Sequence, residues 1–207
     1  MNRITRLILS LTAMLAAGCA DNTLAPKPSA VDMTIRGGGS TAALTSADTT
    51  RFSFLIDSKR TLTYSLGAGN TITFPAKSMC DVNATYGVGE WDKPCVVSKD
   101  SLTVNAKAWL DADGFPHVDF DKHIRFVPSP NPALWVMISL DPYGATTTMW
   151  STINYCPTLD PASCFDESIN DPSVATLVDP ITGRRTRHVK HFSGYSLTSG
   201  RSVDEMF

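Results

Sequence analysis

The sequence predicts an all-β protein, an antiparallel β-sandwich of about eight or nine strands that follows a signal peptide and a flexible tether. Three observations carry this prediction. Large apolar residues alternate with polar ones from Arg51 onward, which is the period of a strand with one buried face. No helical pattern of three turns appears after residue 20. Glycines and prolines separate the alternating segments, as they do in sandwiches of short strands.

The alternation is clearest over residues 102–110, where Val104, Ala106 and Ala108 share one face. Pro75 ends an earlier strand, because proline cannot donate to a strand ladder. Residues 77–100 contain Gly87, Gly89 and Pro94 together with two cysteines, Cys80 and Cys95, and are expected to form a loop closed by a disulfide. Up to residue 140, the predicted strands cover residues 51–57, 61–66, 71–74, 102–110, 118–126 and 134–140.

The segment 141–183 is rich in loops. Four Asp-Pro pairs begin there, and each forces its aspartate out of helical geometry and favours a turn. Short strands are expected at residues 150–155 and 174–178, and one last long strand at residues 184–197.

The first nineteen residues have the pattern of an export signal. Arg3 and Arg6 precede an apolar run from Leu7 to Ala17, and Gly18-Cys19 closes it. The run is too short to span a bilayer stably. A cysteine at the cleavage point resembles the lipobox of bacterial lipoproteins, although Ala16 stands where that family favours leucine. The resemblance implies cleavage after residue 18 and acylation of Cys19. Ala20 is not the aspartate linked to inner-membrane retention, so we expect the outer membrane.

Residues 19–50 are expected to be a lipidated cysteine and a disordered tether. This stretch consists mainly of small and polar residues and contains Gly37-Gly38-Gly39, so it buries too little apolar surface to fold. No later stretch is apolar enough for a membrane helix, so the expected attachment to the membrane is through lipid alone. The sandwich domain is predicted for residues 51–207.

The charge of the mature chain gives no reason to expect a nucleic acid partner. Removal of residues 1–18 takes away two arginines and no acidic residue, which leaves 16 basic against 20 acidic residues, a net charge of −4. Nucleic-acid-binding domains are usually basic.

Four cysteines remain after Cys19, and an even number in an exported chain indicates two disulfides. We predict the local pairing, Cys80 with Cys95 and Cys156 with Cys164, because each pair brackets a loop-like segment. The other two connectivities stay open at this stage. A zinc site is disfavoured, because the chain has no Cys-x-x-Cys spacing.

Three groups of residues invite a chemical interpretation. His117, Asp119, Asp121 and His123 fall on one face of a strand, but neighbours on that face lie about 6.6 Å apart and converge poorly on one ion, so we predict no metal. A second, basic face is formed by Arg184, Thr186, His188 and Lys190. In the third group, His191 and Ser193 share the face that is expected to be buried. They could be structural, or they could be a base and a nucleophile.

Three short segments resemble the ZU-five type of β-sandwich. The segment Lys190-His-Phe-Ser-Gly-Tyr195 is similar to the closing strand of that family, Thr71-Ile-Thr-Phe-Pro-Ala76 to a strand that ends in a Pro-Ala step, and residues 118–126 to its central strand. The resemblance implies an interaction module without a cofactor. It also implies, from some relatives, self-cleavage at the Phe192–Ser193 bond. Because Gly194 follows the serine and lets the backbone relax, we predict that this bond stays intact.

We therefore expect a non-enzymatic lipoprotein of the cell envelope without a cofactor, anchored in the membrane by lipid. Its sandwich would bind an envelope protein or a surface polymer. The alternative is a self-processing or hydrolytic domain that uses Ser193 and His191. No Gly-x-Ser-x-Gly, His-Glu-x-x-His or phosphate-loop motif supports a turnover enzyme. A glycan-binding role for one of the four tryptophans, Trp91, Trp109, Trp135 or Trp150, also stays open.

Overall fold

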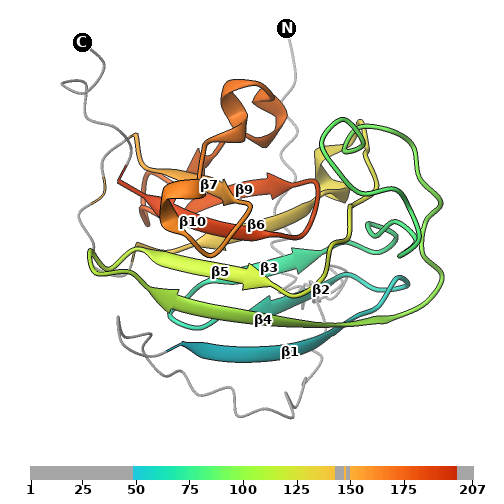
Figure 1. Cartoon of the computed structure of the whole chain (residues 1–207), viewed down its shortest axis with the longest axis horizontal. Coiled ribbons are helices and arrows are strands. Elements are labelled where there is room, and N and C mark those ends of the chain that lie inside the picture. Colours follow the sequence, from blue (N-terminus) through green and yellow to red (C-terminus); the bar gives the residue numbers. More distant parts are fainter. Residues whose placement is uncertain (1–48, 143–146, 148–149, 200–207) are drawn as a thin grey trace, which may run out of the picture. The chain divides into compact units, whose positions relative to one another are not determined.

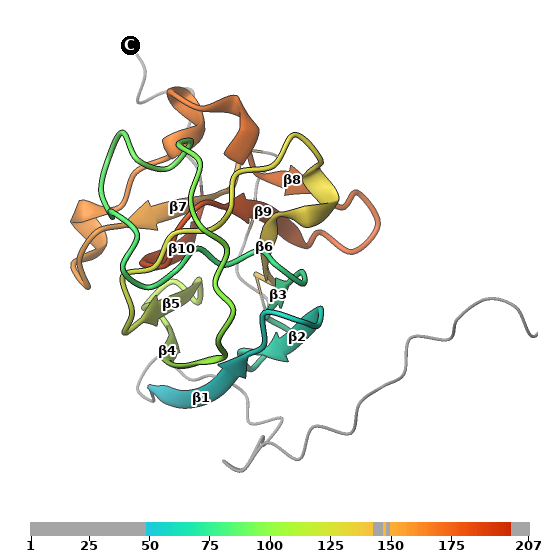
Figure 2. The same cartoon turned by 90° about the vertical axis from the view of Figure 1, so that its right-hand side faces the viewer.

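The computed structural model describes residues 49–142, 147 and 150–199. Chain contacts divide the protein into one unit of residues 1–34 and another of residues 35–207, and all described residues lie in the second. The described residues form ten strands in two antiparallel five-stranded sheets. These sheets lie against each other as a β-sandwich (Figures 1 and 2). The predicted fold class is confirmed, with one or two strands more than expected.

Each sheet combines hairpins with strands that cross over from the other sheet. From edge to edge, the first sheet holds β1 (Thr50–Ile56), β4 (Leu102–Leu110), β5 (Pro116–Phe120), β10 (Gly194–Thr198) and β7 (Thr152–Cys156). The second sheet holds β2 (Leu62–Ser65), β3 (Thr71–Phe74), β6 (Val136–Leu140), β9 (Arg185–Val189) and β8 (Leu177–Val178). Four 3₁₀ turns lie in the connections: η1 (Pro132–Leu134), η2 (Pro161–Ser163), η3 (Glu167–Ile169) and η4 (Pro172–Val174).

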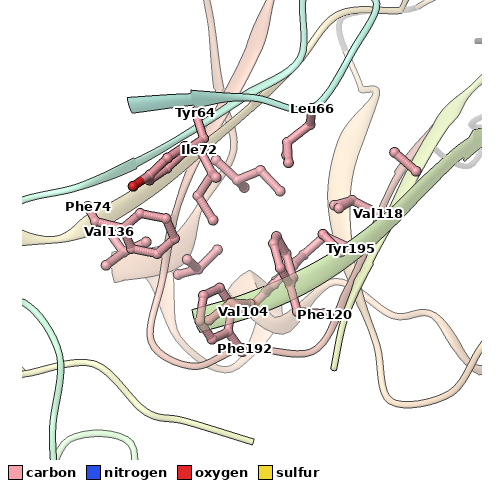
Figure 3. Close-up of a cluster of buried hydrophobic side chains, with 14 of the residues drawn as sticks. Tyr64, Leu66, Ile72, Phe74, Val104, Val118, Phe120, Val136, Phe192 and Tyr195 are labelled. Carbon is pink, nitrogen blue, oxygen red and sulfur yellow. The ribbon is translucent and has the colours of Figure 1, made fainter. Parts of the chain in front are cut away.

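The core lies between the sheets and is built by the alternation that the sequence shows. In β4 the side chains of Val104, Ala106 and Ala108 are buried, while Thr103 and Asn105 are exposed. Side chains of both sheets, among them Phe74 of β3 and Phe120 of β5, point into one interior (Figure 3). In the same core, Phe54 of β1 stacks on Tyr64 of β2 with ring centroids 4.7 Å apart. Aromatic contacts of this kind add to the stabilisation from buried apolar area.

The loop of residues 77–100 carries two of the residues that matter below, and Arg125 holds it in place. The guanidinium of Arg125 is buried and donates hydrogen bonds to three carbonyl oxygens of the loop, those of Glu90, Lys93 and Pro94. Charge-assisted hydrogen bonds of this kind are stronger than neutral ones. The loop is therefore fixed without strand pairing, apart from single bridges at Met79 and Cys80.

The last long strand, predicted for residues 184–197, is two strands in different sheets. β9 ends at Val189 and β10 begins at Gly194, and residues 190–193 turn the corner between the sheets. The predicted strand at 118–126 is also shorter, because β5 ends at Phe120. Ile124 and Phe126 remain in the core, in a segment that is held by isolated bridges.

The basic face predicted around β9 is not a free positive patch. The side chain of Lys190 is only 10% exposed and forms ion pairs with Asp92 and Asp171, each at 2.5 Å. Arg184 lies 3.6 Å from Asp141. Carboxylates from neighbouring loops therefore neutralise the face that the sequence predicts to be basic.

Candidate functional site at the corner between β9 and β10

The corner at residues 190–193 is anchored in the core by Phe192. This side chain is fully buried, with its ring centroid 4.6 Å from that of Phe120 and 5.0 Å from that of Phe126. The backbone N–H of Phe192 donates to the carbonyl oxygen of Ile124 at 2.7 Å. The peptide between Phe192 and Ser193 is therefore held at the point where the chain passes from one sheet to the other.

His191 belongs to the corner, and its side chain is buried among aromatic rings. Trp91 stacks on its imidazole with ring centroids 4.0 Å apart, and Tyr155 meets it edge-on at 4.9 Å. Its Nε2 lies 3.2 Å from the Glu167 carboxylate. Because a carboxylate only accepts hydrogen bonds, we assign the imidazole proton to Nε2. The other nitrogen, Nδ1, carries no proton in this tautomer and lies 3.4 Å from the hydroxyl oxygen of Tyr86.

Two tyrosines donate hydrogen bonds to successive carbonyls of the corner. The hydroxyl of Tyr86 donates to the carbonyl oxygen of Phe192 at 2.6 Å, and that of Tyr195 donates to the carbonyl oxygen of His191 at 2.6 Å. Burial raises the pKa of both tyrosines, and the pKa of Tyr195 lies well above its usual value. Both hydroxyls therefore stay protonated at neutral pH and act as donors.

The structure does not place Ser193 and His191 as a nucleophile and its base. The hydroxyl of Ser193 is buried and donates to the carbonyl oxygen of Cys156 at 3.3 Å. The two ring nitrogens of His191 face Glu167 and Tyr86 instead. A serine nucleophile needs a base within hydrogen-bond reach of its hydroxyl, and this arrangement directs the serine proton to a backbone carbonyl.

Glu167 links the corner to an arginine inside the sandwich. The side chain of Arg187 points to the same face of β9 as the core residue Val189 and is fully buried. Its guanidinium meets Glu167 at 2.5 Å, Asp166 at 3.7 Å and the carbonyl oxygen of Ile153 in β7. The arginine therefore joins an edge strand of one sheet to a strand of the other, and η3 with its N-cap residue supplies the carboxylates that compensate its charge.

Gly194 is required by the close approach of β10 to β7. It lies opposite Cys156 in the strand register. A β-carbon at residue 194 would lie 2.8 Å from the carbonyl oxygen of Cys156 and 3.1 Å from its β-carbon. A side chain at this position would force the two backbones apart.

Both predicted disulfides are confirmed. Cys80 is bonded to Cys95, and Cys156 to Cys164. The first closes part of the loop that carries Tyr86 and Trp91 over the corner. The second begins at the last residue of β7 and holds the segment that leads to η3. Each disulfide thus fixes a segment that contacts His191.

The row His117, Asp119, Asp121 and His123 does not converge. His117 lies 3.1 Å from Asp111 and 3.2 Å from Ser196, and Asp121 pairs with Asn105. β5 ends before Asp121, so only the first two residues of the row share a strand. Within the described part of the chain, no three or more potential metal ligands of the His, Cys, Asp and Glu types gather at one point.

Sequence reasoning missed Tyr86, Trp91, Glu167 and Arg187 as neighbours of the corner. Tyr86 and Trp91 lie in a loop, and Glu167 lies in a 3₁₀ turn, where no periodicity shows which way a side chain points. The spacing of the cysteines was the available signal, since each pair brackets or borders one of these segments. Arg187 was missed because charged side chains are rarely fully buried.

The predicted signal peptide, Cys19 and most of the tether lie outside the described residues. Within residues 49–142 and 150–199, no helix has the length and apolar character needed to cross a membrane. Comparison of the chain with protein-family models, with curated proteins and with solved structures found no match.

Proposed function

We propose that this chain is a non-enzymatic lipoprotein of the bacterial cell envelope, anchored in the outer membrane, whose β-sandwich binds an envelope protein or a surface polymer. The distribution of its five cysteines carries the proposal. Four of them form two disulfides inside the sandwich, as is usual for proteins of oxidising compartments. The fifth, Cys19, stands at the end of the export signal.

The distance along the chain between Cys19 and the sandwich fits an anchored module. The first strand begins at Thr50, so about thirty residues of low apolar content separate the acylated cysteine from the folded domain. A flexible chain of this length spans on the order of 30 Å. Two or more acyl chains would make the attachment stable, since each buried methylene contributes about 0.8 kcal/mol.

The test is the chemistry of Cys19. Expressed in a bacterium that processes lipoproteins, the protein should partition into detergent and carry acyl mass on an N-terminal Cys19. Cys19→Ala should leave the uncut precursor in the membrane, whereas Ala20→Ser should be processed normally. A mature protein that begins at Ala20 or later and carries no lipid would remove the anchor from the proposal.

The position of the anchor is tested by membrane fractionation. We expect the lipidated protein in the outer membrane, and we expect Ala20→Asp to move it toward the inner membrane. Recovery of the unsubstituted protein in the inner membrane would contradict the proposed location, but it would not contradict lipidation of Cys19.

A second candidate function is self-processing at Phe192–Ser193, within a sandwich of the ZU-five type. One observation favours it: the Tyr86 hydroxyl donates to the carbonyl oxygen of Phe192, where a donor would stabilise a developing oxyanion. The orientation of Ser193 toward Cys156 counts against it. The three segments that resemble the ZU-five family include β3, β5 and the corner between β9 and β10. This second candidate function therefore includes the proposal that the sandwich is related to that family.

A further inference from the structure

The outer face of the second sheet carries a groove of about 340 Å³. Its floor is a row across three strands, with Thr73 of β3 opposite Met137 of β6, and Met137 opposite His188 of β9. The rest of its lining consists of Thr61, Pro75, Ala76, the turn η1 and the following Trp135. This volume lies at the lower end of the range for small-molecule sites.

Trp135 lines the groove and is fixed by contacts with three neighbouring residues. Its indole N–H donates to the carbonyl oxygen of Ser129 at 2.6 Å, and the ring of His188 meets it edge-on with centroids 5.3 Å apart. The ammonium of Lys190 lies 5.4 Å from the centre of the indole. Because Trp135 lines the groove and its single hydrogen-bond donor is already used, the contact that it can make with a ligand is through its ring surface.

The described residues that line the groove include no carboxylate, ammonium or guanidinium group, and the ammonium of Lys190 beside Trp135 is paired with two carboxylates, those of Asp92 and Asp171. Burial lowers the pKa of His188, an effect that its hydrogen bond to the backbone of Ser173 partly offsets, so the imidazole is neutral at pH 7. The hydroxyl of Thr73 pairs with that of Thr63 at 2.9 Å and keeps further hydrogen-bonding capacity. The lining is thus suited to an uncharged ligand with both an apolar face and hydroxyl groups.

A proline-rich peptide is the other uncharged ligand that an aromatic groove could take. Such a peptide presents backbone carbonyls that need donors. The donor that Trp135 could supply is engaged with Ser129, which favours a ligand that needs only the apolar surface of the ring.

We propose that this groove binds an uncharged saccharide, with the C–H face of one pyranose ring packed against Trp135 and its hydroxyls toward Thr73 and His188. The inference deepens the proposed function by naming the class of surface polymer, and it rests on the interaction role of the sandwich. It is independent of lipidation at Cys19, because the groove is formed wholly by the sandwich.

The experiment measures saccharide binding to the mature full-length chain, purified in a detergent whose headgroup is not a sugar. The probes are cellotriose, maltotriose and chitotriose, with sialyllactose and decaproline for comparison. Isothermal titration and saturation-transfer NMR at pH 7 should detect at least one neutral trisaccharide, and saturation should pass from the protein to its ring C–H protons. Trp135→Ala should weaken this binding about tenfold or more.

Two further variants separate loss of the groove from loss of the fold. Thr73→Lys should block binding by filling the floor, while Ser53→Lys, at an exposed position of the other sheet, should not. Trp150→Ala removes an exposed tryptophan that does not line the groove and should bind as the unmodified protein does. Thermal melting of each variant checks folding.

Binding of none of the three neutral trisaccharides would overturn the inference, and so would binding that Trp135→Ala and Thr73→Lys leave unchanged. Binding of decaproline alone would overturn it in favour of a peptide groove. None of these results bears on the acyl mass at Cys19, so failure of the groove and failure of the anchor are distinguishable.

Discussion

The hydroxyl of Tyr86 donates a 2.6 Å hydrogen bond to the carbonyl oxygen of Phe192, 106 residues further along the chain. The Cys80–Cys95 disulfide brackets the loop position of Tyr86, and Phe192 sits in the core. This contact therefore ties the stapled loop to the point where the chain changes sheets. It polarises the carbonyl that a self-cleaving serine would attack, while the serine itself points elsewhere.

We predict that the Phe192–Ser193 bond stays intact. In the native arrangement the Ser193 proton goes to the Cys156 carbonyl, and His191 is engaged by Glu167 and Tyr86. Intact-mass analysis of a neutral, unheated preparation should show the unbroken mature chain, with Ser193→Ala differing only by the mass of one oxygen. Release of the 15-residue peptide 193–207 from the unmodified protein alone would favour self-processing. Acid and heat must be avoided, because Asp179-Pro180 is acid-labile and would release a 28-residue fragment.

Replacement of Gly194 by alanine should destabilise the sandwich by about 1–3 kcal/mol, as overpacking does. The added β-carbon would meet the Cys156 carbonyl oxygen at 2.8 Å, a backbone atom that can move only with β7. Urea unfolding of Gly194→Ala measures the cost, and Ser53→Ala on the exposed face of β1 serves as the control. An unchanged midpoint would show that β7 and β10 can separate freely at this point.

The sequence predicts the fold well only in segments where apolar and polar residues alternate regularly. β4 agrees with its predicted bounds because nine residues alternate without interruption. The sequence does not predict the corner between β9 and β10, because Val189 and Tyr195 both face the core. They are six residues apart, an even spacing that also fits one continuous strand. The alternation therefore continues across a change of sheet. Phe192 is the residue out of phase, and its burial is the sign that the chain turns there.

The candidate site was predictable only in part for the same reason. His191 and Ser193 are buried as expected, but their hydrogen-bond partners come from segments without periodicity. Tyr86 reaches the corner from the stapled loop, and Glu167 reaches it from a 3₁₀ turn. Cysteine spacing predicts that disulfides fix these segments, but it does not predict which residues their side chains contact.

The two disulfides should differ in their contribution to stability. In the chain-entropy model, closing the loop from Cys80 to Cys95, 16 residues with both cysteines counted, stabilises the fold by about 3 kcal/mol. Closing the loop from Cys156 to Cys164, 9 residues counted in the same way, stabilises it by about 2.5 kcal/mol. Paired Cys→Ser variants measured by urea unfolding in the absence of reductant test this.

Non-reducing peptide mapping of the unmodified protein should recover the same two pairs. Free thiols at all four positions would contradict both the pairing and the inferred oxidising compartment.

Removal of the Glu167 carboxylate should lower the free energy of unfolding strongly, more than is usual for a substitution in a surface loop. Glu167→Ala leaves the fully buried Arg187 with only Asp166, at 3.7 Å, as its carboxylate partner. Breaking a buried ion pair from one side costs about 3–5 kcal/mol. Urea unfolding measures the loss.

The matched control for Glu167 is Glu90→Ala, which breaks the pair of Glu90 with Lys93, whose side chain is 61% exposed. An exposed pair of this kind contributes less than about 1 kcal/mol. Equal losses in the two variants would mean that the Arg187 charge is compensated by solvent or by Asp166. The double variant Glu167→Gln with Arg187→Met should recover part of the stability lost in Glu167→Ala, because it removes the uncompensated charge.

Asp119 should destabilise the folded state at neutral pH. Burial raises the pKa of its carboxyl above the usual value, and the nearby charges of Lys107 and His123 offset this only in part. The folded protein therefore holds this proton more tightly than the unfolded chain does. Stability falls as the pH rises from the unfolded pKa to the folded one, and the full penalty persists above the folded pKa. Asp119→Asn should accordingly raise the urea midpoint at pH 7 and leave it unchanged near pH 3.

Asp171→Asn is the control of opposite sign. Burial would raise the pKa of Asp171, but its hydrogen bonds with Lys190 and Ser173 outweigh burial and lower it. The ionised carboxylate therefore stabilises the fold above the unfolded pKa, and this stabilisation is lost as the pH falls through the folded pKa. Asp171→Asn should lower the midpoint at pH 7, and its difference from the unmodified protein should shrink near pH 3. If both variants shift the midpoint in the same direction at pH 7, the opposite environments assigned to these two carboxylates are wrong.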